Sequence, residues 1–226
     1  MNNKLFRAAV ALCTVFMMSG TAAIAQENEL VPYQEGLHYF EIEQASAVSG
    51  DTVEVVELFS YLCTHCNTFE PYINSLVKRI PDYVDFRRIP VVFGRGSWEL
   101  YARGFITAEL MNLPEEAHMG MMDRLWKEKK IMRSLDEIAE FYSQYGADKE
   151  KFLSTAQSFA VDGRMRKDQL DVRNYGITGT PALVVAGKYR IAGNAAVPSF
   201  EAMLDVVDFL VEKERAGMQQ ISATAD

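Results

Sequence analysis

The feature that most constrains the fold is a short apolar segment that runs directly into a Cys-x-x-Cys motif. Residues 53–59 are rich in β-branched and aromatic residues and are too short for a free-standing helix, so we predict a central strand there. The motif, Cys63 to Cys66, follows almost at once. Apolar residues then recur at helical spacing: Phe69, Ile73, Leu76, Val77 and Ile80. This pattern predicts an amphipathic helix over about 63–79, with a kink at Pro71.

The rest of the chain predicts strands at both ends of a long helical block. A second strand is expected at 84–92, and an extra one at 39–42. Helices are expected at 98–111 and 114–129, after a capping box at Ser134 and Glu137, and once or twice within 152–175. Strands return at 182–185 and 189–192, and Ser199 opens a last helix whose tail frays from about Ala216. The fold class is therefore α/β, with an all-helical insertion between the second and third core strands.

The N-terminus has the features of a secretory signal peptide. Lys4 and Arg7 precede an apolar run of about eleven residues, and small residues end at Ala25. That run is too short for a membrane span, which needs roughly twenty residues. We predict cleavage after residue 25 and a soluble, exported mature protein. Cys13 would leave with the signal peptide, so the mature chain would keep one cysteine pair.

Charge and length limit the possible functions. Without Lys4 and Arg7, the basic residues fall from 23 to 21 against 31 acidic ones, and the net charge moves from −8 to −10. Nucleic acid is therefore not an expected partner. About 200 mature residues fit one domain over 26–226. We expect its core at about 36–94 and 176–214, and the insertion at about 97–175.

A Cys-x-x-Cys pair has several uses. A zinc site needs about four ligands, but the chain offers this pair and only His38, His65 and His118, so no metal is expected. A purely structural disulfide is a second possibility. It would close a very short loop and contribute only about 2 kcal/mol in the chain-entropy model, which is little for a domain of this size.

Position favours a redox-active disulfide between Cys63 and Cys66. A helix that begins at Cys63 exposes the sulfur to unpaired N–H groups and to the helix dipole, which stabilise a thiolate. Cys63 is then the exposed nucleophile and Cys66 the buried resolving thiol. Protonated His65 adds positive charge beside the thiolate, and Thr64 offers a hydroxyl donor, so the motif predicts an oxidant. The alternative for His65 is an ordinary surface histidine.

Other residues carry weaker signals. His38 and His118 have no partner pattern and are expected to be surface or packing residues. Methionines crowd the insertion and suit either a promiscuous binding surface or, more commonly, the core between helices: Met111, Met119, Met121, Met122 and Met132. Pro181 precedes the strand at 182–185, where a proline can be a plain turn residue or a cis residue.

In combination, these motifs resemble the thioredoxin superfamily. The resemblance rests on Phe59 to Cys66, on Pro71, and on Gly179-Thr180-Pro181. The helical insertion resembles the DsbA family of periplasmic disulfide oxidases. The resemblance covers roughly 39–210, which is nearly the whole predicted mature chain.

The resemblance implies further roles. In the family, the proline matching Pro181 is cis and packs against the disulfide, and the residue matching Thr180 pairs through its backbone with an extended substrate peptide. Acids at the positions of Glu57 and Glu70 lie beneath the active site and assist proton transfer to the buried thiol. The alternatives are that Glu57 is half exposed on an edge and Glu70 is a solvated helix residue. A buried carboxylate would have a raised pKa unless paired.

The expected activity is donation of the disulfide to unfolded or newly exported cysteine-containing proteins. The resemblance implies reoxidation by the quinone-linked membrane protein DsbB and no cofactor bound to this chain. We expect a monomer. The alternatives are an isomerase or reductase of the same superfamily, a peptide-binding chaperone module, and a structural periplasmic protein with an inert pair.

Overall fold

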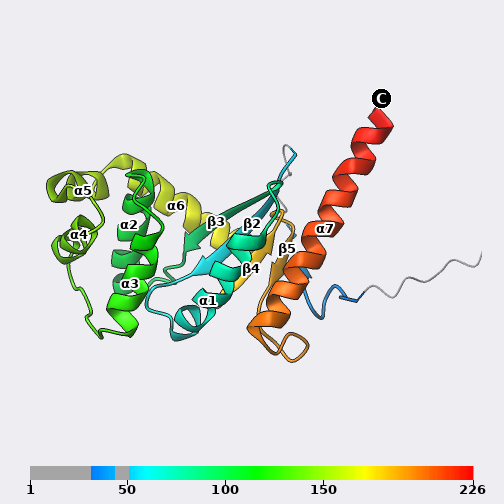
Figure 1. Cartoon of the computed structure of the whole chain (residues 1–226), viewed down its shortest axis with the longest axis horizontal. Coiled ribbons are helices and arrows are strands. Elements are labelled where there is room, and N and C mark those ends of the chain that lie inside the picture. The colour runs from blue at the N-terminus through cyan, green and yellow to red at the C-terminus, as the bar shows by residue number, and fades with distance from the viewer. Residues whose placement is uncertain (1–31, 44–50, 226) are drawn as a thin grey trace, which may run out of the picture. The chain divides into compact units, whose positions relative to one another are not determined.

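The computed structural model describes residues 32–43 and 51–225, with side chains through residue 220 (Figure 1). The predicted signal peptide and Cys13 lie outside these residues. The strands are β1 (Phe40–Glu41), β2 (Val53–Phe59), β3 (Val84–Pro90), β4 (Ala182–Val185) and β5 (Tyr189–Ile191). The helices are α1 (Thr64–Arg79), α2 (Gly96–Leu110), α3 (Glu116–Trp126), α4 (Leu135–Ser143), α5 (Lys149–Ala156), α6 (Phe159–Asn174) and α7 (Phe200–Ala225).

The described strands form one mixed sheet in the order β1-β5-β4-β2-β3. β2 is an interior strand, parallel to β3 and antiparallel to β4. The parallel pair is connected by α1, because parallel neighbours need a crossover rather than a hairpin. Helices α2 to α6 follow β3 and precede β4. The predicted α/β architecture with a helical insertion is therefore confirmed.

The strand expected at 189–192 ends one residue early, at Ile191, and two other strand predictions differ by two residues. The strand expected to reach Val92 stops at Pro90, because the chain turns at Phe93 and Gly94, whose φ angles are +48° and +69°. The extra strand expected at 39–42 shortens to Phe40–Glu41, which pairs with β5 at the edge of the sheet. None of these differences moves the cysteines.

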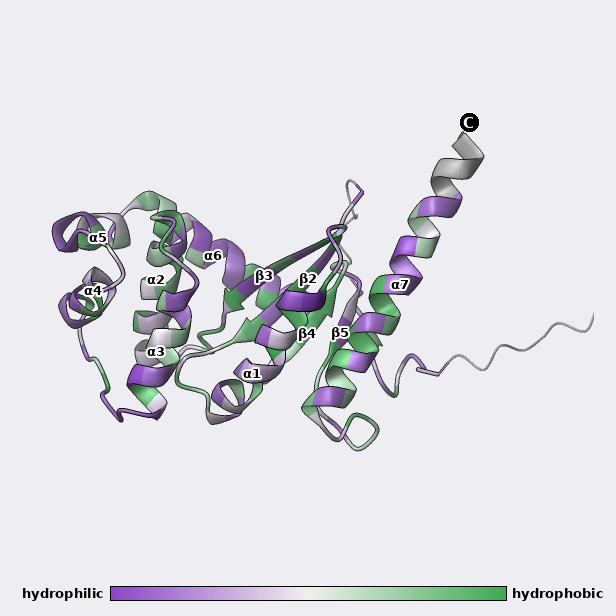
Figure 2. Ribbon diagram, in the orientation of Figure 1, coloured by the Kyte–Doolittle hydropathy of each residue, from purple (hydrophilic) through white to green (hydrophobic). Residues whose placement is uncertain are grey.

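Alternate residues of β2 face opposite sides of the sheet, as the period of a strand requires. Val53 and Val55 pack in a cluster with residues of α1 and α7. Val56 and Leu58 pack in another cluster, with Val172 of α6. Figure 2 shows apolar residues concentrated in the strands and along α7 where it passes the sheet. By the same alternation, Glu57 belongs to the face that α1 covers.

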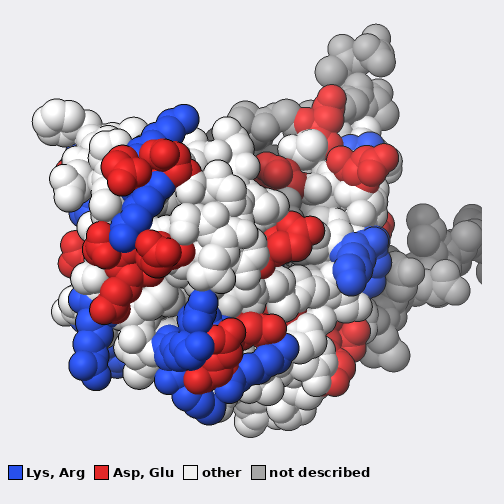
Figure 3. Space-filling model, turned by 60° about the vertical axis from the view of Figure 1, so that its left-hand side comes forward, with Lys and Arg blue, Asp and Glu red and all other residues white. Residues whose placement is uncertain are grey.

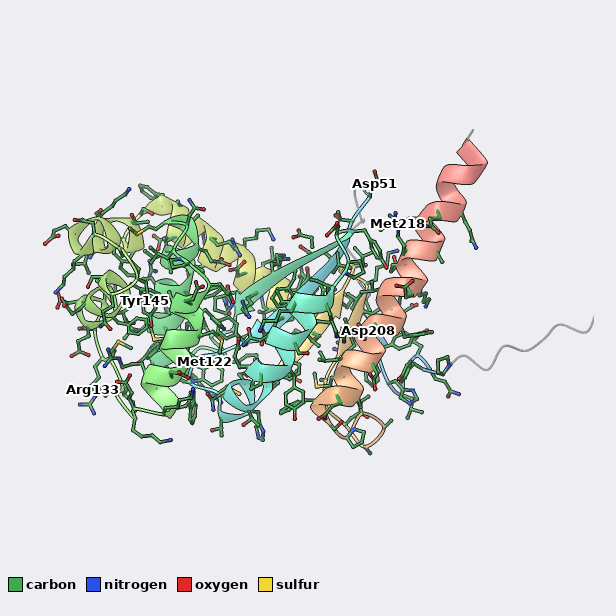
Figure 4. All side chains as sticks on the ribbon, viewed as in Figure 1. Asp51, Met122, Arg133, Tyr145, Asp208 and Met218 are labelled. Atoms are coloured by element: carbon green, nitrogen blue, oxygen red, sulfur yellow. The ribbon has the colours of Figure 1, made fainter. Side chains whose placement is uncertain are left out.

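The insertion has its own apolar cluster, which also includes Cys66. Met121, Met122 (labelled in Figure 4) and Met132 are buried in it, and Met111 packs against it, which supports their expected role as core residues. The cap at Ser134 is confirmed, since its Oγ accepts the N–H of Glu137. The Glu137 carboxylate instead accepts the N–H of Arg133, one residue before the cap.

On the face of the insertion seen in Figure 3, basic side chains lie next to acidic ones and form no continuous basic surface in that view. Lys149, for example, pairs with Asp136 at 3.2 Å and with Glu140 at 3.1 Å. Such exposed pairs contribute little stability, typically about 0–1 kcal/mol each. Because of these pairs, positive and negative charges alternate on this surface.

The last helix is longer than predicted. Ser199 caps α7 as expected, since its Oγ accepts the N–H of Ala202 at 3.1 Å. Asp208 of α7 (Figure 4) pairs with Arg79 of α1 at 2.8 Å. The predicted fraying from Ala216 is wrong for the backbone, because the helix continues to Ala225 while Met218 still packs against the apolar cluster beneath it. Among the residues described, no helix combines the length and the apolar character needed to cross a membrane.

Candidate active site

Cys63 stands at the N-cap of α1, with extended backbone angles (φ −97°, ψ 117°). Three residues separate it from the end of β2, so the strand delivers the sulfur directly to the helix N-terminus. Its Sγ accepts the N–H of Cys66 at 3.4 Å, and the Cys63 thiol lies 3.4 Å from the carbonyl oxygen of Thr180. Cys63 is partly exposed, Cys66 is fully buried, and both are free thiols. The predicted geometry of an accessible and a buried sulfur is therefore present.

The surroundings separate the two thiols electrostatically. A hydrogen bond from the Cys66 thiol is the largest cause that lowers the pKa of Cys63, to about 5, against the opposing effect of partial burial. The side chain of Thr180 and the backbone N–H groups of Cys66 and His65 lower this pKa further. Burial, followed by the Cys63 sulfur, raises the pKa of Cys66 far above the ordinary thiol range. Cys63 is thus the thiolate of the reduced pair and Cys66 its protonated neighbour.

Alkylation of the reduced protein should therefore use the Cys63 thiolate down to about pH 5 and slow only below it, by about tenfold per pH unit. Because the pKa of Cys63 is lowered from 9.0 in the folded state, the thiolate stabilises the reduced fold fully above about pH 9. That gain declines as the pH falls and is gone below about pH 5. Rates of alkylation by iodoacetamide, measured from about pH 4 to about pH 9, test the predicted pKa of Cys63. A midpoint near the ordinary thiol value of about 8.5 would contradict it.

Thr64 and His65, the residues between the cysteines, are both exposed on the first turn of α1. In the described structure neither side chain hydrogen-bonds to Cys63, and the Thr64 carbonyl accepts the hydroxyl of Thr68 at 3.1 Å. The contribution of His65 to the thiolate comes from its backbone N–H. Roles for the His65 and Thr64 side chains therefore remain predictions.

Opposite the cysteines lies the turn before β4. The Thr180–Pro181 peptide bond is cis, as the resemblance implied. Both residues line a groove of about 840 Å³, which also includes His65 and Tyr72 of α1, Arg190 of β5 and Phe200 of α7. The groove lies beside Cys63, because the carbonyl of Thr180 is the group that contacts its sulfur. An extended chain can reach the sulfur from this groove.

Charged side chains are buried beneath the cysteine helix. Arg88 of β3, only 6% exposed, donates from Nε to Glu57 at 2.9 Å and from Nη2 to Glu70 at 3.2 Å. Its Nη1 donates to Glu115, which is 61% exposed. Glu57 is fully buried, Glu70 nearly so, and Glu70 lies one helical turn beyond Cys66. The structure thus brings both predicted acids together, and the exposed alternatives for Glu57 and Glu70 are wrong.

The two carboxyl groups differ in protonation. Burial raises the pKa of Glu57 to about 8, and the charge and hydrogen bond of Arg88 offset only part of this effect. Burial also raises the pKa of Glu70, but the hydrogen bond and charge of His118, followed by the charge of Arg88, outweigh burial and leave that pKa lowered. The expectation that a buried carboxylate has a raised pKa unless it is paired holds for Glu70, which is paired with Arg88 and His118. Glu57 is also paired with Arg88, but burial outweighs that pairing. The Oε1 of Glu57, which has no hydrogen-bond partner in the described structure, is the atom positioned to carry the proton.

In the oxidised protein, where Cys63 carries no titrating thiol, the contribution of Glu57 to stability should therefore fall as the pH rises from about 4.5 to about 8. A carboxyl group whose pKa is raised in the folded state stabilises the fold fully below its unfolded pKa, and this gain is lost through the folded pKa. The slope should reach about 1.4 kcal/mol per pH unit, and Glu57→Gln should flatten it. Urea unfolding at about pH 5 and pH 8 measures the slope. An unchanged slope in Glu57→Gln would show that Glu57 is ionised across this range.

Arg88 and His118 were not predicted as site residues. His118, expected at the surface or in packing, is a buried member of the charged group: its Nδ1 lies 2.9 Å from the hydroxyl of Tyr61 and its Nε2 lies 3.2 Å from Glu70. Burial and the charge of Arg88 lower the pKa of His118. Arg88 carried only a weak signal, because a second arginine, Arg87, directly precedes it in a strand that also contains Asp85. His118 had none, since its partners are 57 and 48 residues away in sequence. His38 is partly exposed and packs edge-on against the ring of Tyr33, and its Nδ1 accepts the N–H of Gln34.

The fold and the site define a class. A thiolate at a helix N-terminus, a buried second thiol and a cis-proline turn facing them, on a mixed sheet, are the parts of a thioredoxin-fold thiol–disulfide oxidoreductase.

Comparison with known proteins identifies the family. A family model described as the DSBA-like thioredoxin domain matches residues 54–205. The thiol:disulfide interchange protein DsbA of Pseudomonas aeruginosa is 39% identical over 97% of this chain and 100% of its own length. The DsbA of Pseudomonas syringae is 37% identical over 96% of this chain and 97% of its own length. The crystal structure of Pseudomonas aeruginosa DsbA superimposes with a TM-score of 0.77, covering 84% of this chain and 98% of that one. The chain belongs to the DSBA-like thioredoxin family.

Proposed function

We propose that this oxidoreductase is a disulfide oxidase that donates the Cys63–Cys66 disulfide to newly exported, cysteine-containing proteins. The observation that supports the direction is the stabilised Cys63 thiolate, whose pKa is lowered to about 5. Each pKa unit below the ambient pH favours the reduced form by about 1.4 kcal/mol, or about 30 mV for a two-electron couple. An enzyme whose reduced form is more stable than its oxidised form transfers its disulfide to substrate thiols.

The proposed reaction has two exchange steps. A substrate thiolate attacks Cys63 Sγ, the bond between the two enzyme sulfurs breaks, and its electron pair leaves on Cys66. A second substrate thiolate then attacks the substrate sulfur of the mixed disulfide and displaces Cys63 as a thiolate. The substrate dithiol loses two electrons and the enzyme disulfide gains them. Cys63 is the sulfur attacked in the first step because it is exposed. In the second step Cys63 is a good leaving group because it is the less basic thiol.

The first step leaves a thiolate on buried Cys66, which needs a proton because its pKa is strongly raised. We assign the donor to Glu57, whose pKa near 8 keeps it protonated at neutral pH. Glu70 is ionised between Arg88 and His118, so its part is to balance the buried positive charge. Thr64 and His65 form the first turn of α1, which directs the backbone N–H of His65 toward the Cys63 sulfur.

The substrate is proposed to bind as an extended chain in the groove of about 840 Å³, pairing with the backbone of Thr180 next to cis Pro181. The signal peptide predicted for residues 1–25 supports a location in the periplasm. A DsbB-like membrane protein would reoxidise it, so the chain itself would need no cofactor and would meet a quinone only through that partner. We propose that it acts as a monomer.

The test is single-turnover transfer. The oxidised enzyme is mixed with a reduced, unfolded dithiol protein, and thiols on both partners are counted after an acid quench. A disulfide oxidase loses its disulfide as the substrate gains one. If the oxidised enzyme keeps its disulfide in this assay, while the reduced enzyme rearranges the disulfides of a scrambled substrate, the isomerase alternative replaces this proposal.

A further inference from the structure

We propose that Arg190 makes the groove beside Cys63 selective for substrate segments that carry an Asp or Glu side chain. This inference rests on the proposed function, since it requires a peptide to lie in that groove. It adds a preference that neither the fold nor the cysteine pair supplies.

Arg190 belongs to β5, and its guanidinium is held in the wall of the groove by two contacts. Nη1 donates to the carbonyl oxygen of Gly176 at 2.8 Å, and the guanidinium carbon lies 5.4 Å from the centre of the Phe40 ring. Within the described residues, Nε and Nη2 make no hydrogen bond. The guanidinium is therefore oriented in advance and retains free donors.

Its electrostatic situation differs from that of comparable arginines. Arg87, Arg88, Arg103 and Arg164 are also at least partly buried, and each has a carboxylate oxygen within 4.0 Å. Arg190 has no such partner among the described residues. A partly desolvated guanidinium without a counter-charge favours a carboxylate, which it can bind through two parallel hydrogen bonds.

The acid that shares the groove does not fill this need. The pKa of Glu201 is lowered by hydrogen bonds from its own backbone N–H, then from the side chains of Ser199 and Tyr72. Glu201 is thus engaged at the N-terminus of α7. A bound peptide would therefore supply the carboxylate that pairs with Arg190.

The sheet order sets the distance. β5 lies two strands from β2, the strand that leads to Cys63, and strands lie about 4.8 Å apart, which gives about 10 Å across the sheet. Arg190 pairs with Val184, and Val184 pairs with Val56, which lies three residues, or about 10 Å, before the end of β2. The two components combine to a backbone separation of about 14 Å. An extended peptide advances about 3.3 Å per residue. The acidic residue should therefore lie about four residues from the cysteine that attacks Cys63.

The experiment uses the oxidised full chain and amidated peptides with one cysteine. A single Glu is placed about three to six residues away on either side, and each peptide has a matched Gln partner. The rate of mixed-disulfide formation is read by mass spectrometry after an acid quench. In at least one position Glu should react about three- to tenfold faster than Gln. Arg190→Gln should bring that ratio to about one, and Arg190→Glu should favour Lys at the same position.

Arg215→Gln is a matched control. Arg215 also donates to one backbone carbonyl, that of Asp51 at 3.0 Å, and lies over the ring of Tyr83, but it is not part of the groove. This variant should keep the Glu preference. A second peptide set with a free terminal carboxylate and no Glu shows whether a chain end can occupy the same place.

Two results would overturn the inference while the proposed function stands: equal rates for Glu and Gln at every position, or a Glu preference that survives in Arg190→Gln. If no peptide forms a mixed disulfide although the reduced enzyme is alkylated at Cys63, the proposed function itself fails and the inference fails with it.

Discussion

Replacing Cys63 with serine should abolish disulfide transfer and leave the fold intact. The sulfur of Cys63 is the atom that the substrate attacks, and no other described cysteine is accessible, since Cys66 is buried. Loss of a residue that forms the covalent intermediate should reduce the single-turnover rate by at least about a thousandfold. The measurement is the transfer assay with Cys63→Ser, with circular dichroism as the check on folding.

A variant with Cys66 replaced by serine is the companion to this experiment. This variant keeps the Cys63 thiolate, which should still be alkylated rapidly, but it cannot form the Cys63–Cys66 disulfide. If Cys63→Ala instead bound unfolded chains normally and supported function in vivo, the chain would be a peptide-binding chaperone module. Its cysteine pair would then be incidental.

The second large effect is expected from Arg88→Met, which should destabilise the protein by about 3–5 kcal/mol at pH 7. Methionine fills much of the same space, but it leaves Glu57 and Glu70 buried without their shared cation. Arg87, the preceding residue, pairs with the partly exposed Glu54, so Arg87→Met should cost only about 1 kcal/mol. Urea unfolding of the three proteins measures the difference.

The loss in Arg88→Met should depend on pH in a defined direction. Without the arginine, burial raises the pKa of both acids, so the variant gains protons on folding and becomes relatively more stable as the pH falls. The gap to the unsubstituted protein should therefore shrink between about pH 7 and pH 5. Equal losses in Arg87→Met and Arg88→Met would contradict the buried network described above.

Much of the fold could be predicted from local sequence. β2 and β4 have the predicted bounds, because each is a compact run of β-branched residues that ends at a turn or at the cysteines. Helix α1 begins at the cysteine pair as its apolar spacing indicated. Predictions failed where a tertiary contact decides, as at the end of α7, where Met218 packs against the core.

The candidate site was predictable to the extent that it lies in contiguous motifs. Cys63, Cys66 and Pro181 come together because β2 and β4 are neighbours in the sheet. The buried network was not predictable in full, since it joins β2, α1, β3 and the insertion. His118, for example, gains its role only when α3 packs beside Tyr61 and Glu70. Its neighbours in sequence carry no sign of that role.

The central claim is that the Cys63–Cys66 disulfide is a donor, and its reduction potential tests this claim most directly. The potential is measured by equilibrating the protein in glutathione buffers and counting free thiols. A value well above the roughly −270 mV of thioredoxin, rising further as the Cys63 thiolate forms, is the predicted result. A value at or below that of thioredoxin would contradict the account and indicate a reductase or an inert structural disulfide.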